Sequence, residues 1–220
     1  MHLTELMPSI TRLIDYEYDA IRNPAYDALI QAHLEAARPV ELPQFVQVSG
    51  IPGAGKSTFI ANRDFSDFFI LSFDKIMLSI PQYDADVKKH GLVQAFATWE
   101  MPARVIGYEI LKRALLKKAD IVLEHSGTNP AHVELFKALP QLGYRTHVHF
   151  LLCDLDVALE RVKRRADFAN RHISKEIVTQ RFVLVQQYIQ EYEKITGISI
   201  YDPKKRDAAL HPLTRLSHPK

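Results

Sequence analysis

The stretch SGIPGAGKSTF, residues 49–59, combines residue types that can hold a chain of phosphates. It fits the P-loop pattern, in which four residues separate a first glycine from a Gly-Lys-Ser run. Glycines let backbone N–H groups converge on phosphate oxygens, the lysine neutralises those oxygens, and the serine hydroxyl can ligate Mg²⁺. A short apolar strand precedes the loop and a helix follows it, which is the setting that a nucleotide site requires. We therefore expect ATP and Mg²⁺ as cofactors, with Ser57 as a metal ligand, Lys56 as a catalytic cation, and nucleotide contacts from Gly50, Gly53, Ala54, Gly55, Lys56, Ser57 and Thr58.

Other motifs decide which class of P-loop protein this is. A GTPase would carry an N-K-x-D base-reading motif and a D-x-x-G switch, and neither occurs. An AAA+ motor would end a strand in Asp-Glu, and an ABC ATPase would have an L-S-G-G-Q signature; both are missing. The motifs therefore favour a small kinase, in which a lid closes over ATP and an acceptor hydroxyl is phosphorylated.

Apolar runs alternate with helical patterns along most of the chain, which predicts a parallel sheet with helices on both faces. The expected fold class is α/β, a three-layer P-loop NTPase fold with a central five-stranded, mainly parallel sheet and an N-terminal helical extension. We assign 1–43 to that helical segment, 44–203 to the kinase domain with a lid at about 161–174, and 204–220 to a basic tail. Strands are expected at 45–49, 68–73, within 120–126, 146–153 and 198–201, and the main helices at 84–98, 102–118, 130–140, 155–166 and 174–197, the last one capped by Ser174 and Gly197.

Two carboxylates follow predicted strands and can reach the same crevice as the P-loop. Asp74 ends the second strand and Glu124 ends the third. Ligands of parallel α/β sheets gather at the carboxyl ends of the strands, so both side chains are placed to accept a proton from an acceptor hydroxyl or to hold a water of Mg²⁺. The alternatives left open are an N-cap role for Asp74 and a loop hydrogen bond for Glu124.

A basic segment, LERVKRRADFANRHIS at 159–174, lies between the last two predicted strands. Arg161 and Arg165 are four residues apart and share one helix face, and Arg171 follows in the interruption before the next helix. Arginines on a mobile lid can stabilise the charge that spreads over a transferred phosphoryl group. We expect these three arginines to be catalytic, the alternative being an ordinary solvated charged face.

With these residues in hand, the chain resembles the zeta-toxin family of P-loop kinases, which is related to polynucleotide kinases and chloramphenicol phosphotransferases. The resemblance covers about residues 40–203. It rests on the loop GIPGAGKST, on DKIMLSIPQY at 74–83 with its Asp-x6-Pro-x-Tyr spacing, on IVLEHSGT at 121–128, and on ISIYD at 198–202.

The resemblance implies a phosphotransferase that acts on the sugar hydroxyl of a UDP-activated amino sugar. In that case Asp74 is the base that activates the acceptor hydroxyl, and the acceptor is contacted by Tyr83, Glu124 and Thr128. Two features depart from the family: the arginine that it commonly has three residues after the aspartate is Met77 here, and the spacing of the lid arginines differs. The expected acceptor is therefore a nucleotide sugar or a related metabolite, with the UDP sugar itself left open.

Composition bounds the partners. The formal net charge is only +2, and no apolar run approaches the ~18 residues of a membrane span. The single cysteine, Cys153, excludes a disulfide within the chain and fits a reducing compartment. We expect a cytoplasmic enzyme with a small-molecule hydroxyl acceptor and with neither a membrane nor a nucleic-acid partner. The alternatives are a 5′-hydroxyl polynucleotide kinase, and an ATP-binding toxin–antitoxin interaction protein of little turnover, which would dock an antitoxin protein through residues 1–43.

Overall fold

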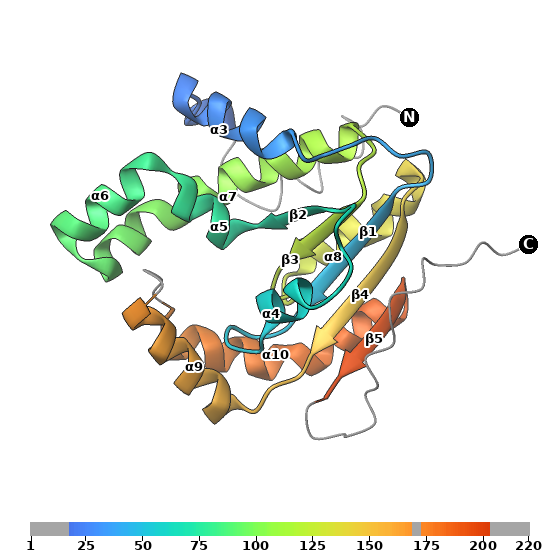
Figure 1. The fold of residues 1–220 in the computed structure, drawn as a ribbon. Helices are drawn as coiled ribbons and strands as arrows, with labels where there is room; N and C mark the ends of the chain where they lie inside the picture. The colour runs from blue at the N-terminus through green and yellow to red at the C-terminus, as the bar shows by residue number, and fades with distance from the viewer. Residues whose placement is uncertain (1–17, 169–172, 203–220) are drawn as a thin grey trace, which may run out of the picture.

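A parallel sheet of five strands forms the centre of the computed structural model, which describes residues 18–168 and 173–202 (Figure 1). The strand order is β2-β3-β1-β4-β5, and every neighbouring pair is parallel. This confirms the predicted α/β class and the five-stranded sheet. The strands are β1 (Gln44–Ser49), β2 (Phe69–Ser72), β3 (Ile121–Glu124), β4 (Arg145–Leu151) and β5 (Gly197–Tyr201).

Helices connect the strands, as parallel pairing demands. None of the helices in the described part of the chain is both long and apolar enough to cross a bilayer. The α-helices are α3 (Pro24–Leu34), α4 (Lys56–Ala61), α5 (Phe73–Ser79), α6 (Pro81–His90), α7 (Leu92–Leu116), α8 (Pro130–Ala138), α9 (Leu155–Phe168) and α10 (Lys175–Glu193), and the 3₁₀-helices are η1 (Tyr18–Ala20) and η2 (Leu139–Leu142).

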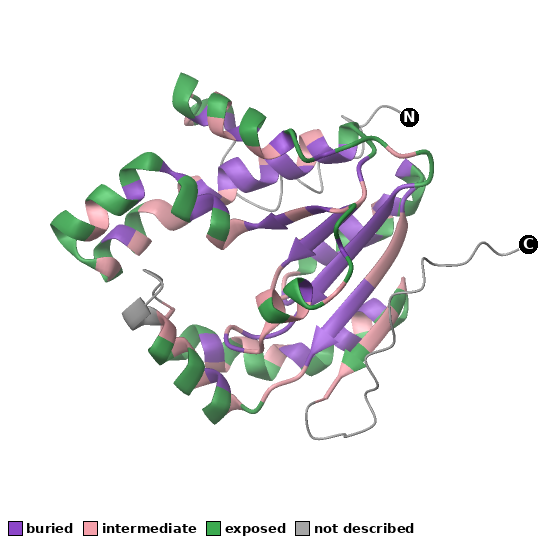
Figure 2. Ribbon diagram, in the orientation of Figure 1, coloured by how far each residue is buried: buried purple, intermediate pink, exposed green. Residues whose placement is uncertain are grey.

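The two faces of the sheet carry hydrophobic cores of different size. Side chains of α7, α8 and α10 pack with Phe45 of β1 in the larger core. Val46 and Val48, which alternate with Phe45 along the strand, pack with Ile60 of α4 in the smaller one. Strand β1 is therefore buried along its whole length, and in Figure 2 the central strands β1 and β3 are coloured as buried, whereas the edge strand β5 is not. A strand buried on both faces is typical of parallel sheets.

Helix α7 differs from the prediction. The sequence predicted two helices with a break before Pro102, but Pro102 lies inside one continuous helix of 25 residues. The break lies instead at Gly91, whose φ of 83° is outside the helical range. A proline inside a helix costs about 3 kcal/mol. Burial of ten α7 residues offsets that cost, because each large apolar side chain among them contributes roughly 1.5–3 kcal/mol.

Helix α10 begins where predicted but ends earlier. The hydroxyl of Ser174 accepts a hydrogen bond from the N–H of Ile177, which confirms the N-cap. The C-cap is Lys194, and Gly197 is the first residue of β5 rather than the residue after the helix. A Cβ at Gly197 would lie 2.9 Å from Nδ1 of His147 on β4, so the glycine leaves room for that side chain and does not form a turn.

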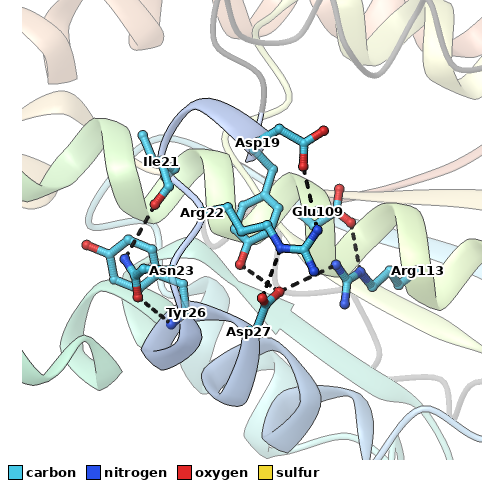
Figure 3. A network of polar contacts seen from close by, with 9 residues as sticks. Asp19, Ile21, Arg22, Asn23, Tyr26, Asp27, Glu109 and Arg113 are labelled. Carbon is cyan, nitrogen blue, oxygen red and sulfur yellow. Dashed lines mark hydrogen bonds and ion pairs between the residues drawn. The ribbon is translucent and has the colours of Figure 1, made fainter.

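The described part of the N-terminal extension is attached to α7. Ile30 and Leu34 of α3 are buried in the larger core. Asp27 is the centre of a polar network between the two helices, shown in Figure 3: Arg22 donates to it at 2.9 Å, and Arg113 of α7 lies 4.0 Å from it. One face of α3 is thus buried against the rest of this chain. Residues 1–17, which complete the predicted helical segment, lie outside the described residues.

Candidate active site

The carboxyl ends of β1, β2 and β3 border one cavity of ≈ 160 Å³, which we call the site cavity. Glu124 is the last residue of β3, as predicted. Asp74 is not a strand end: β2 stops at Ser72, and Asp74 is the second residue of α5. Ser72 occupies the N-cap position, so Asp74 is not that cap either. The charged side chains that line the cavity are Lys56, Asp74, Glu100, Arg104, Glu124 and Arg181.

The P-loop runs from Gly50 to the start of α4. The ammonium of Lys56 curls back over the loop and donates to the carbonyls of Gly50 at 2.8 Å and Ile51 at 3.1 Å. The hydroxyl of Ser57 donates to Oε1 of Glu124 at 2.7 Å. A hydroxyl and a carboxylate that meet beside the loop are oxygen donors of the kind that Mg²⁺ prefers. The residues present therefore fit a Mg²⁺ site. Glu124 is a second candidate ligand beside Ser57. From the sequence, a contact with a water of Mg²⁺ was one of two options for this carboxylate.

Helix α9 closes over the P-loop at Gly53. The backbone of Gly53 has φ +88°, and a Cβ there would lie 2.5 Å from the carbonyl oxygen of Ala158. Nη1 of Arg161, one turn further along α9, donates to the carbonyl of Gly53 at 3.1 Å. The helix that carries Arg161 and Arg165 is therefore in direct contact with the loop that would hold the phosphates.

We expect Gly53→Ala to destabilise the fold by about 3 kcal/mol, from backbone strain together with the clash against α9. Gly143→Ala is the matched control: its φ is +79°, but nothing lies within 4 Å of the added Cβ, so it should show only the strain, about 1 kcal/mol. Urea unfolding measures both free energies. Equal losses in the two variants would mean that α9 does not pack on the loop in solution.

The three predicted lid arginines have different outcomes. Arg161 reaches the P-loop, as described above. Arg165 lies half-buried on the same helix. Arg171 falls in 169–172, outside the described residues. A catalytic role for each of them stays a prediction.

Two of the three predicted substrate residues do not line the site cavity. Tyr83 of α6 is 1% exposed and packs in the larger core. Thr128 is 3% exposed, and its carbonyl and hydroxyl both accept hydrogen bonds from Arg181 of α10, at 2.9 and 2.7 Å. Thr128 thus orients a cavity side chain, and direct acceptor contacts from it and from Tyr83 stay predictions. Glu124 does line the cavity.

Sequence reasoning missed the cavity wall that α7 and α10 form. Arg104 of α7 donates to Glu100 at 2.7 Å, and its i,i+4 spacing is also that of an ordinary surface pair. Arg181 lies on an amphipathic helix far from any motif. Their meeting depends on how two distant helices pack on the sheet, so no local pattern could have revealed it.

A buried polar network supports His125 in the cavity wall. The His125 ring stacks on His132 with centroids 3.8 Å apart and an angle of 2° between the planes. Gln47 uses its amide nitrogen to donate to Ser49, so its amide oxygen accepts from Nδ1 of His132 at 3.1 Å. Nε2 of His132 then accepts from the Tyr108 hydroxyl at 2.9 Å. Burial lowers the pKa of His132 to about 3, which keeps this ring neutral.

His125 itself is held in one tautomer. Its Nδ1 accepts a hydrogen bond from the N–H of Gly127 at 3.1 Å, so the proton of the neutral ring is on Nε2. Burial lowers the pKa of His125 well below its usual value, and the neighbouring His132 and Arg181 lower it further. His125 therefore presents an N–H donor, not a cation, at physiological pH.

Solved structures with this fold include a protein from a toxin–antitoxin system and a two-protein complex. The protein from the PezAT chromosomal toxin–antitoxin system of Streptococcus pneumoniae matches with a TM-score of 0.64 and 13% identity, over 82% of this chain and 77% of that one. The AvrRxo1-ORF1:AvrRxo1-ORF2 complex with sulphate ions matches with a TM-score of 0.63 and 12% identity, over 80% of this chain. The chain spans only 62% of that second protein. At these identities the likeness shows the fold alone.

Sequence comparison identifies the family. No curated protein sequence matches the chain. The family model described as zeta toxin matches residues 28–212, well over half of the 220 residues. That range contains the P-loop, Asp74, Glu124 and the whole sheet. The chain therefore belongs to the zeta-toxin family and has its P-loop kinase fold.

Proposed function

We propose that the protein is an ATP-dependent phosphotransferase that phosphorylates a hydroxyl group of a small molecule. The observation that carries the proposal is the convergence of Lys56, Asp74 and Glu124 on one cavity, with Ser57 bonded to Glu124 at the P-loop. A matched structure of the AvrRxo1-ORF1:-ORF2 complex was determined with ATP, with a TM-score of 0.61 and 12% identity, which supports ATP as the donor.

Each residue has a role in this proposal. Asp74 accepts the proton of the acceptor hydroxyl as that oxygen attacks the γ-phosphorus of ATP, and ADP leaves. Lys56 gives up its bonds to the loop carbonyls and stabilises the phosphoryl oxygens, and Arg161 adds positive charge beside Gly53. Ser57 and Glu124 would hold Mg²⁺, which when bound neutralises charge on the phosphate chain.

One residue of the cavity wall bears on the choice of acceptor. Met77, at the position where the family commonly has an arginine, lines the cavity as an apolar side chain. It cannot form the ion pair that an arginine would form with a phosphate, so the acceptor need not be the UDP sugar of the family. We therefore propose a nucleotide sugar or a related metabolite.

An antitoxin partner is a second element of the proposal. The matched structures come from a toxin–antitoxin system and from a two-protein complex. Docking through residues 1–43 is limited by α3, whose Tyr26, Ile30 and Leu34 are buried within this chain. Among the described residues of that segment, the outer face of α3 and exposed residues on either side of it, such as Asp19, Arg38 and Leu42, are left for such a partner.

A transfer assay with γ-labelled ATP separates the acceptor classes. We expect label to appear in a small-molecule fraction that includes UDP sugars and related nucleotide sugars, and not in an oligonucleotide with a 5′-hydroxyl, because a net charge of +2 provides no strong field for nucleic acid. Labelling of the oligonucleotide alone would identify a polynucleotide kinase. ATP binding without any labelled product would favour the interaction protein of little turnover.

A further inference from the structure

Arg181 lines the site cavity as a cation that forms no ion pair with the residues that the structure describes. Within the described part of the chain no carboxylate lies at ion-pair distance from it, and both of its hydrogen bonds go from Nη1 to the neutral Thr128. Its Nε and Nη2 have no hydrogen-bond partner among the same residues, and the side chain lines the site cavity. Burial and the nearby Arg104 lower the pKa of Arg181, so its charge is held at a cost. Such a group is expected to gain an anionic partner when the cavity fills.

Arg104 contributes to the same wall from α7. Its bond to Glu100 uses Nη2, and the two side chains are 43% and 37% exposed. The charges of Arg104 and Glu100 on α7 and of Arg181 on α10 give a formal sum of +1. The other cavity charges belong to phosphoryl transfer, in the roles given above to Lys56, Asp74 and Glu124. This wall therefore keeps a positive charge that the transfer chemistry does not use.

His125 adds a neutral donor beside these arginines. Because Nδ1 accepts from Gly127, the Nε2–H is available, and it has no partner among the described residues. The charges of Arg181 and Arg104 both act on the His125 ring, which places the three groups near one another. Two guanidinium groups and one imidazole N–H form a set of donors that suits a carboxylate or a phosphate.

We propose that Arg181, Arg104 and the Nε2–H of His125 form an anion subsite, which binds a carboxylate or phosphate group of the hydroxyl-bearing acceptor. The proposal rests on the proposed function, because the acceptor is the molecule whose hydroxyl the enzyme would phosphorylate. It makes Arg181 a specificity-determining residue: the enzyme selects acceptors that carry an anionic group apart from the hydroxyl that is phosphorylated. Phe73, Met77 and Phe96 add apolar surface to the same cavity, which suits the carbon skeleton between the two groups.

The subsite can be tested without transfer. ¹⁵N-labelled protein is saturated with AMP-PNP·Mg²⁺, so that the P-loop is occupied, and is titrated with methyl phosphate and, separately, with acetate. We expect at least one of these anions to shift the amide signals of Gly127 and Thr128. We expect Arg181→Gln to weaken that binding at least tenfold, the order expected for hydrogen bonds to a charged group. Arg104→Gln should weaken it as well. The tighter of the two anions identifies phosphate or carboxylate as the preferred group.

The matched control is Arg38→Gln, which removes one positive charge from an exposed residue between α3 and β1 and should leave the affinity unchanged. Thermal unfolding of Arg181→Gln shows whether the protein still folds without the hydrogen bonds from Arg181 to Thr128. If this variant is unfolded, the anion affinity of Arg104→Gln tests the subsite instead. Wild-type affinity in the folded Arg181 or Arg104 variant, or no anion binding to the nucleotide-loaded wild type, overturns the subsite. Neither result depends on whether phosphate is transferred, which the labelled-ATP assay measures separately.

Discussion

Replacing Asp74 with asparagine is expected to lower kcat for phosphoryl transfer by roughly 10²- to 10⁴-fold, the range that a positioned general base contributes. Asparagine keeps the size of the side chain but cannot accept the proton of the acceptor hydroxyl. Asp74 lines the cavity together with Lys56 and Glu124, where the phosphoryl group would be transferred. Initial rates with γ-labelled ATP and a saturating acceptor measure the effect.

The control for this experiment separates catalysis from binding. ATP·Mg²⁺ affinity of Asp74→Asn should stay within about tenfold of the wild type, because the P-loop and the Ser57–Glu124 pair are intact. Asp84→Asn is the matched variant, since Asp84 is an exposed α6 carboxylate whose ion pair is with Lys88, and its kcat should be unchanged. Transfer at the wild-type rate in Asp74→Asn would remove the base assignment.

The second large effect is expected at Lys56. Lys56→Ala removes the ammonium that bonds the loop carbonyls and would bond the phosphate oxygens. Loss of charged hydrogen bonds worth about 3 kcal/mol corresponds to roughly 10²-fold weaker ATP·Mg²⁺ binding. Isothermal titration calorimetry measures the affinity directly.

A second lysine provides the comparison. Lys137→Ala removes an exposed lysine of α8 whose ion pair is with Glu134, and it should bind ATP·Mg²⁺ as the wild type does. If Lys56→Ala were to bind the nucleotide with unchanged affinity, the phosphates would not lie on this loop, and the assignment of the P-loop as a nucleotide site would be wrong.

The sheet and the P-loop could be predicted from the sequence because both produce local patterns of residue types. Buried parallel strands appear as short apolar runs, and the P-loop lies between one such run and a helix, so the sheet and the loop were correctly located. The helix ends predicted at Pro102 and Gly197 were wrong because packing outweighs the local preference of these residues. Helix α7 continues through the proline, and the glycine makes room for His147. Local rules fail where tertiary contacts outweigh them.

The site was predicted in part for the same reason. Glu124 is the last residue of its strand, so the rule about carboxyl ends found it. The bond between Ser57 and Glu124 joins residues 67 positions apart and requires the register of β1 and β3. The position of the Arg181 side chain in the cavity wall depends in addition on the packing of α10 against the loop that contains Thr128. A single sequence contains no periodicity that reports either contact.

The most direct test of the central claim is where the γ-phosphate of ATP goes. Wild-type protein, Asp74→Asn and Lys56→Ala are incubated with γ-labelled ATP and a mixture of hydroxyl-bearing metabolites, and labelled products are separated from inorganic phosphate. The account predicts an acid-stable phosphate ester of a small molecule with the wild type, and at most about a hundredth of that product with Asp74→Asn. Label found only in inorganic phosphate, at the same rate in the wild type and in Asp74→Asn, would contradict it.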